Sequence, residues 1–205
     1  MVEESNWVEI TRSDPDHSAR YVQRFRDMAA AGKDLGGEAR FVDAMVARNS
    51  RILDAGCGPG RVGAFLHACG HHVVGVDVDP VLIAAAEEDH PGPIWLVGDL
   101  AELDLPSRGV GERFEAIVAA GNVMAFLAPS TRRLVLSRLG AHLADDGRLV
   151  VGFGVGREYE FSDFRSDVSA AELNIDVQFS TWDLRPFTSE SDFLVAVMSK
   201  AEVAR

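Results

Sequence analysis

The chain has 205 residues, of which 47% are hydrophobic and 25% charged, and its formal net charge is −12. This is an ordinary globular balance at a length that one α/β domain can fill. No stretch approaches the roughly 18 consecutive apolar residues of a membrane span. The acidic start of the sequence lacks the basic and apolar regions of a secretory signal. We therefore expect a cytoplasmic protein that makes no contact with a membrane.

The charge also bears on possible partners. Nucleic-acid binders usually carry a basic patch, because much of their affinity comes from neutralising phosphates. The densest basic runs here, residues 20–26 and 132–138, are spaced like solvated helix faces. Cys57 and Cys69 make no disulfide framework and are too few for a zinc site without histidines at ligand spacing. We expect no nucleic-acid partner and no metal, and the oligomeric state stays open.

Helical patterns and short apolar runs follow one another along the chain. Two helical stretches come first, at residues 16–31 and 37–48. Apolar runs then alternate with segments of helical spacing, which predicts βαβ units, a parallel sheet and right-handed connections. The runs cover residues 51–54, 72–76, 94–97, 114–120 and 148–155, and the helical segments cover residues 61–69, 80–88 and 134–143.

The end of the chain has a different pattern. Residues 145–147, Asp-Asp-Gly, predict a turn before the fifth run. Two more strand-like runs, residues 174–181 and 192–199, have no helical pattern between them, so we expect an antiparallel pair at one edge of the sheet. We see one domain, residues 1–205. It consists of a helical cap or lid (1–50), a cofactor-binding core (51–155) and a final helix with the antiparallel pair (156–205).

The strongest local signal is the segment ILDAGCGPG at residues 52–60. A helix follows this glycine-rich loop directly, so its free N–H groups face whatever lies on the loop. The glycines have the spacing G-x-G-x-G after Asp54, whereas the dinucleotide fingerprint is G-x-G-x-x-G. The Asp54 carboxylate would repel a pyrophosphate and favour a ligand with an amino or sulfonium group. A purely structural turn would use glycines as well.

Two more acids stand at the ends of the next apolar runs. Asp77 lies 17 residues after Gly60 and could accept hydrogen bonds from both ribose hydroxyls. Alternatively, Asp77 or Asp79 caps the next helix, and Asp79 suits that role because Pro80 follows it. Asp99 could accept from an adenine amino group, and alone it fits a turn equally well.

Taken together, the three signals resemble the class I S-adenosylmethionine (SAM)-dependent methyltransferase family, over about residues 40–200. The resemblance implies a Rossmann-like, doubly wound, seven-stranded α/β sheet, mostly parallel with an antiparallel C-terminal strand. It also implies SAM as the cofactor. The glycine loop would bind SAM, Asp77 would bind its ribose, and Asp99 would lie beside its adenine. The predicted cofactor-binding residues are Asp54, Ala55, Gly56, Cys57, Gly58, Gly60, Asp77, Val78, Asp99, Leu100, Ala120, Gly121 and Asn122.

The same resemblance implies methyl transfer by in-line attack on the methyl carbon of SAM. We expect a small-molecule acceptor, because the signatures of DNA-base methylation are absent after the fourth apolar run. A general base is needed only if the acceptor must lose a proton. Asn122 is a weak catalytic candidate and could equally be a cap or turn residue. Met124 and Phe126 either line the acceptor pocket or belong to the core.

Two segments are weaker candidates for acceptor binding. His17, Tyr21 and Arg24 share one helix face, where Tyr21 would reach the cofactor and His17 would act as a base. A solvated helix with an inward aromatic stripe is the alternative that we favour. Trp182 and Arg185 could recognise substrate from the loop before the last strand, or form a structural Trp with an Asp–Arg pair. A non-catalytic SAM-binding regulatory domain remains the alternative function, since fold does not fix function.

Overall fold

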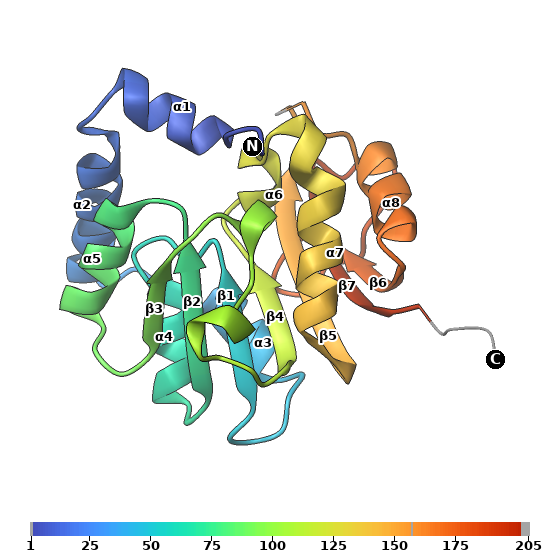
Figure 1. Ribbon diagram of the computed structural model, residues 1–205, viewed down its shortest axis with the longest axis horizontal. Coiled ribbons are helices and arrows are strands. Elements are labelled where there is room, and N and C mark those ends of the chain that lie inside the picture. Colours follow the sequence, from blue (N-terminus) through green and yellow to red (C-terminus); the bar gives the residue numbers. More distant parts are fainter. Residues whose placement is uncertain (1, 157, 202–205) are drawn as a thin grey trace.

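The computed structural model describes residues 2–156 and 158–201, and seven strands in this part of the chain form one sheet in the order β3-β2-β1-β4-β5-β7-β6. Neighbours among β1 to β5 pair in parallel, and β7 pairs antiparallel with β5 and with β6 (Figure 1). This confirms the predicted mostly parallel sheet with an antiparallel pair at one edge. The strands are β1 (Arg51–Ala55), β2 (His72–Asp77), β3 (Ile94–Val97), β4 (Phe114–Ala119), β5 (Leu143–Gly154), β6 (Leu173–Phe179) and β7 (Phe193–Lys200).

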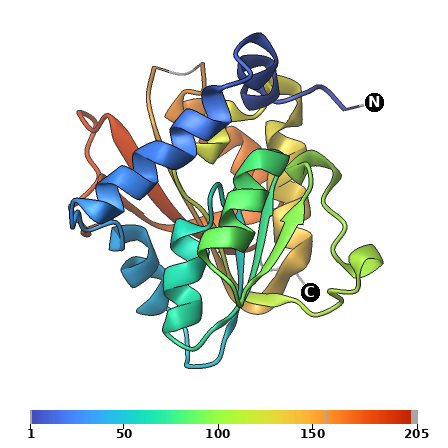
Figure 2. The ribbon, with the colours of Figure 1, turned by 90° about the vertical axis from the view of Figure 1, so that its left-hand side faces the viewer.

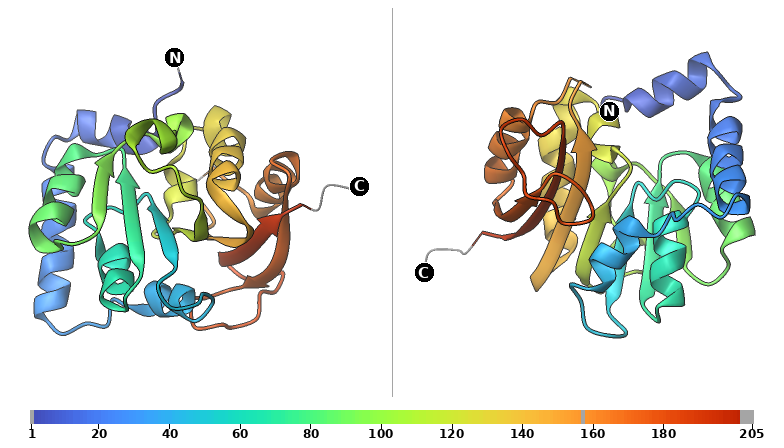
Figure 3. Two further views of the ribbon diagram at one scale, coloured as in Figure 1. Left: turned by 60° about the horizontal axis from the view of Figure 1, so that its bottom comes forward. Right: turned by 180° about the vertical axis from the view of Figure 1, so that it is seen from behind.

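Helices cover both faces of this sheet (Figure 3). Successive strand residues point to opposite faces, so Ile52 packs with α3 and α4 while Leu53 packs with α7 and α8. Both faces are therefore buried, which explains why the strands are continuous apolar runs. The helices are α1 (Asn6–Ser13), α2 (His17–Ala30), α3 (Gly37–Asp43), α4 (Arg61–Ala68), α5 (Pro80–Asp89), α6 (Val123–Phe126), α7 (Arg132–His142) and α8 (Phe161–Ala170).

Three local expectations differ from the structure. The helix predicted over residues 37–48 ends at Asp43. The turn expected at residues 145–147 lies inside β5, whose pairing with β4 jumps from Leu143 to Arg148 and leaves these residues as a bulge. Helix α1 was not predicted, because Trp7 is its single buried residue.

The first two helices lie at the carboxyl end of the parallel strands. Helix α1 crosses above the strand arrowheads, and α2 runs alongside α5 (Figures 1 and 2). A ligand bound at this end of the sheet would therefore lie beneath two helices that come well before the glycine loop in the sequence. Within the described residues, no helix is both long and apolar enough to cross a membrane.

Candidate cofactor site and family

The glycine loop connects β1 to α4 at the carboxyl edge of the sheet. Gly56, Gly58 and Gly60 have φ angles of +74°, +55° and +83°, which side chains with a Cβ rarely adopt. At Gly56 a Cβ would also overlap the Val123 side chain. The Asp54 carboxylate accepts a hydrogen bond from the Gly63 N–H at 2.8 Å, so it fixes the start of α4. The loop thus leaves open backbone facing the edge where ligands of α/β sheets bind.

Asp77 ties this loop to the end of β2. Its Oδ2 accepts from the Gly58 N–H at 2.8 Å, and its Oδ1 accepts from the Asp79 N–H at 3.0 Å. Asp79 caps α5 by accepting from the Val81 N–H at 2.8 Å, as its position before proline predicted. Asp77 is therefore not the helix cap, and its assignment to the ribose stays a prediction.

Burial raises the pKa of both Asp54 and Asp77. Asp54 is 2% exposed, and burial raises its pKa from 3.8 to about 7 despite the Gly63 N–H and the nearby Arg61. Asp77 is 8% exposed, and burial raises its pKa to about 6. Arg61 is close, but its guanidinium is held by Glu38 at 2.6 and 2.8 Å. Neither buried carboxylate has a cation of its own among the described residues.

A pocket lies where these elements meet. Its lining brings together most of the predicted cofactor residues from the ends of successive strands. Ala55, Gly60 and Asn122 are predicted residues that do not line it. Those that do are Asp54, Gly56, Cys57, Gly58, Asp77, Val78, Asp99, Leu100, Ala120 and Gly121.

The roof of the pocket comes from the N-terminal helices. Ser5, Trp7, Tyr21 and Phe25 line the pocket, and the Trp7 ring meets Phe126 edge-on with ring centroids 5.5 Å apart. Among these residues, the sequence predicts a possible role in the site only for Tyr21 and Phe126. One feature of the sequence could have revealed α1 and with it Trp7: Ser5 is a good N-cap residue that stands directly before this helix.

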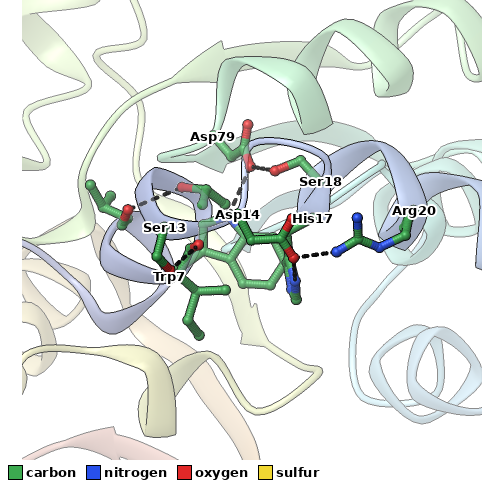
Figure 4. A network of polar contacts seen from close by, with 10 residues as sticks. Trp7, Ser13, Asp14, His17, Ser18, Arg20 and Asp79 are labelled. Atoms are coloured by element: carbon green, nitrogen blue, oxygen red, sulfur yellow. Dashed lines mark hydrogen bonds and ion pairs between the residues drawn. The ribbon is translucent and has the colours of Figure 1, made fainter.

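The candidate base His17 lies outside the pocket. Its ring packs edge-on against Trp7 at 5.1 Å, and its Nδ1 is 3.8 Å from Asp14 (Figure 4). Tyr21 lines the pocket, and burial raises the pKa of its hydroxyl above 10.0. Arg24 stacks on the Tyr21 ring at 4.9 Å. The predicted face is thus an aromatic stripe turned inward at Tyr21, with His17 at its edge.

Asn122 has a turn role. Its φ is +67°, and its Oδ1 accepts from the Gly154 N–H at 2.8 Å, joining the ends of β4 and β5. Met124 is fully buried in the core, whereas Phe126 lines the pocket. The Asn122 side chain thus has a structural partner and does not line the pocket, whereas its neighbours Gly121 and Val123 do.

Trp182 and Arg185 lie in a different part of the molecule. The Trp182 ring packs on Gly152 of β5 and edge-on against Phe41 of α3 at 5.5 Å. Arg185 is 3.4 Å from Asp183 in an exposed pair. Neither residue lines this pocket, and their part in substrate recognition stays a prediction.

Cys57 and Cys69 are free thiols, and Cys57 is buried within the glycine loop. Burial raises the pKa of the Cys57 thiol, so the thiol stays protonated and is a poor nucleophile. His71 is buried and its Nε2 is 2.9 Å from Asp43, a structural contact. The described residues contain no group of three or more His, Cys, Asp or Glu that could hold a metal ion.

A strand, a glycine loop, a helix N-terminus and acids at successive strand ends define a Rossmann-like nucleotide-binding protein. The sequence model of a protein family described as a methyltransferase domain matches residues 52–147. A TehB-like SAM-dependent methyltransferase from Corynebacterium glutamicum has 47% sequence identity and a TM-score of 0.85, with 91% of this chain and 100% of that chain covered. The chain therefore belongs to the SAM-dependent methyltransferases, a family of enzymes whose methyl donor is SAM, as the motifs had indicated.

Curated relatives match over shorter lengths. An uncharacterized methyltransferase of Mycobacterium tuberculosis is 37% identical over 114 residues, which is 54% of each chain. The magnesium-protoporphyrin O-methyltransferase of Rhodobacter capsulatus is 30% identical over 142 residues, 65% of this chain and 57% of that one. The chain thus spans little more than half the length of these relatives. Other matches are named for an amino sugar nucleotide and for an 18S rRNA guanine, so the names share no acceptor.

Proposed function

We propose that this chain is an active methyltransferase that transfers the methyl group of SAM to a small-molecule acceptor. The observation that carries the proposal is the convergence of Asp54, Asp77 and Asp99, from three strand ends, on one pocket. In this proposal Asp77 binds the ribose hydroxyls, and Asp99 and Leu100 lie beside the adenine. The methionine part follows the backbone of Gly56 and Gly58.

The roof supports a small acceptor. Trp7, Tyr21 and Phe25 close the pocket from above, and the net charge of −12 disfavours a polyanionic substrate. Aromatic faces also attract a cation such as the sulfonium of SAM. A ligand seated under this roof would be partly shielded from water, which favours an in-line displacement, because that reaction needs alignment and desolvation more than a covalent group.

The chemistry proposed here relies on positioning. The described lining holds no histidine or lysine, and the weak candidates His17 and Asn122 are not part of it. The three acids of the lining are assigned to the cofactor in this proposal, so the acceptor would attack as a neutral or already ionised nucleophile and any proton that it releases would go to solvent. The S_N2-type displacement leaves S-adenosylhomocysteine (SAH) and the methylated acceptor as products.

We also propose that the enzyme acts in the cytoplasm. Its two cysteines, Cys57 and Cys69, are unpaired, which fits a reducing compartment.

The test is incubation of the purified chain with methyl-deuterated SAM and a panel of amines, thiols, phenols and carboxylic acids, with an RNA fragment included. The proposal expects a small product heavier by one labelled methyl group, together with an equal amount of SAH, as measured by mass spectrometry. Labelled RNA would contradict the small-molecule acceptor. Binding of SAM without any turnover would favour the alternative function, a non-catalytic SAM-binding regulatory domain.

A further inference from the structure

One buried carboxylate connects the N-terminal helices to the cofactor pocket. Asp79 is 6% exposed, and its Oδ1 caps α5 through the Val81 N–H. Its Oδ2 accepts from the Trp7 Nε1–H of α1 at 2.8 Å and from the Ser18 hydroxyl of α2 (Figure 4). Its backbone N–H donates to Asp77. Asp79 therefore touches both roof helices and the predicted ribose acid, although it does not line the pocket itself.

The roof helices share the pocket with the two buried acids. Trp7 of α1 and Tyr21 of α2 line the same pocket as Asp54 and Asp77, so a movement of α1 and α2 would change the access of a nucleoside to these acids. The roof rests on a small cluster of buried residues that is separate from the two main cores of the sheet: Trp7, Val22, Leu82 and Ala85. Parts of a protein with few buried apolar contacts open most readily. Gly32, with a φ of +68°, lies in the segment between α2 and α3.

We propose that Asp79 is a positioning residue that fastens α1 and α2 over the pocket, so that residues 6–30 open to admit the cofactor and close on it through Trp7, Asp79 and Ser18. The inference rests on the proposed function, in which the pocket holds SAM. Closure and cofactor binding are then coupled, and each stabilises the other to the same extent.

A second contact between α2 and α5 is weaker. Arg26 pairs with Glu88 at 2.9 Å and with Asp89 at 2.8 Å, near the far end of α5. These side chains are 30–73% exposed, so solvent screens the pairs and their contribution to stability is small. The hydrogen bonds to Asp79 are buried and have a charged acceptor, which makes them the stronger kind. We therefore assign the closing contact, called the latch below, to the hydrogen bonds from Trp7 and Ser18 to Asp79.

Substitutions can separate the latch from the helix cap. Asp79→Asn keeps an oxygen for the Val81 N–H, and Asn caps helices as well as Asp does. Its amide N–H₂ would then face the donors of Trp7 and Ser18, so the latch is lost. Ser18→Ala removes one of the two donors. Ser13→Ala is the matched control, because the Ser13 hydroxyl donates only to the Ile10 carbonyl within α1.

The experiment compares hydrogen–deuterium exchange of the full chain without ligand and the rate at which bound SAM dissociates. We expect Asp79→Asn to speed exchange in residues 6–30 and SAM dissociation by about tenfold each, the effect of losing hydrogen bonds to a charged group. Ser18→Ala should change both in the same direction by a smaller factor. Ser13→Ala should match the wild type, and exchange in the sheet should not change in any of the variants.

Unchanged exchange in residues 6–30 for both latch variants would overturn the proposal. Faster exchange throughout the sheet in Asp79→Asn would overturn it as well, because Asp79 would then be a general structural residue. If the wild type fails to bind SAM, the proposed function fails, while the exchange comparison without ligand still decides whether Asp79 fastens the helices.

Discussion

Asp77 is the residue on which the cofactor assignment depends most. Asp77→Ala should weaken SAM binding by about 1.5–3 kcal/mol, because hydrogen bonds to a charged group are lost. The measurement is isothermal titration calorimetry at constant pH, with folding checked by circular dichroism. Asp104→Asn, an exposed acid outside the pocket, is the control and should bind SAM like the wild type. Unchanged affinity in Asp77→Ala would mean that another group holds the ribose.

Gly58 tests the loop backbone. Gly58→Val should abolish SAM binding, because a β-branched side chain strongly disfavours the φ of +55° and the loop must rearrange. A Cβ at this position makes only an ordinary 3.8 Å contact with Tyr21, so the expected loss comes from the backbone and not from a clash. Gly111→Val is the control, since nothing lies within 4 Å of a Cβ there. A Gly58→Val variant that folds and binds SAM would exclude the loop as the cofactor cradle.

The role of a single residue could be predicted from the sequence where its partner is close by in the sequence, and not where the partner is far away. The cap at Asp79 was predictable because its partner, Val81, is two residues away. The role of Asn122 was not, because its partner, Gly154, is 32 residues away on another strand. The second use of Asp79 was hidden for the same reason: Trp7 is 72 positions distant in the sequence.

At the scale of elements, β2 and β3 pair in parallel through their backbones, and one aromatic side chain packs across the pair. The Trp95 ring of β3 lies directly over Gly75 of β2, where a Cβ would overlap it. Gly75→Val should therefore lower the free energy of unfolding by about 1–3 kcal/mol, as expected for an overpacked core. Urea unfolding of this variant beside Gly111→Val measures the effect. Equal stability of the two would show that Trp95 can repack without cost.

The sequence predicted all seven strands and helices α2, α4, α5 and α7. The strands were predictable because their apolar residues form short runs that alternate with helical segments. Helix α1 was missed because it buries a single residue, and the bulge in β5 was taken for a turn because Asp-Asp-Gly is a turn signal. In both cases long-range packing against other elements decided the structure. Because α1 was not predicted, its part of the pocket roof was not predicted either.

At the scale of the whole molecule, the buried acids make stability depend on pH. The folded chain holds protons on Asp54 and Asp77 up to about pH 7 and 6, whereas the unfolded chain loses them near 3.8. Between pH 5 and 7.5, stability without ligand should therefore fall by roughly 2–5 kcal/mol, whereas below about pH 5 the carboxylates with a lowered pKa, such as Asp34 and Glu38, lose their stabilising contribution. Urea unfolding across this range tests the sign.

Asp54→Asn should flatten this pH dependence, because it removes the acid with the larger rise in pKa. The lowered pKa of His90 acts in the opposite direction in both proteins, so the informative quantity is the difference between the variant and the wild type. If the two proteins lose stability equally between pH 5 and 7.5, Asp54 is not the source of the effect.

The central claim, that the pocket under α1 and α2 holds the methyl donor, is tested most directly by calorimetric titration of the wild-type chain with SAM and with SAH. We predict one site per chain for each ligand, with a dissociation constant in the range of about 1–100 μM, and no heat of binding from Gly58→Val. Absence of binding by both ligands, in a chain that is folded, would contradict the account and leave the pocket to a different nucleotide.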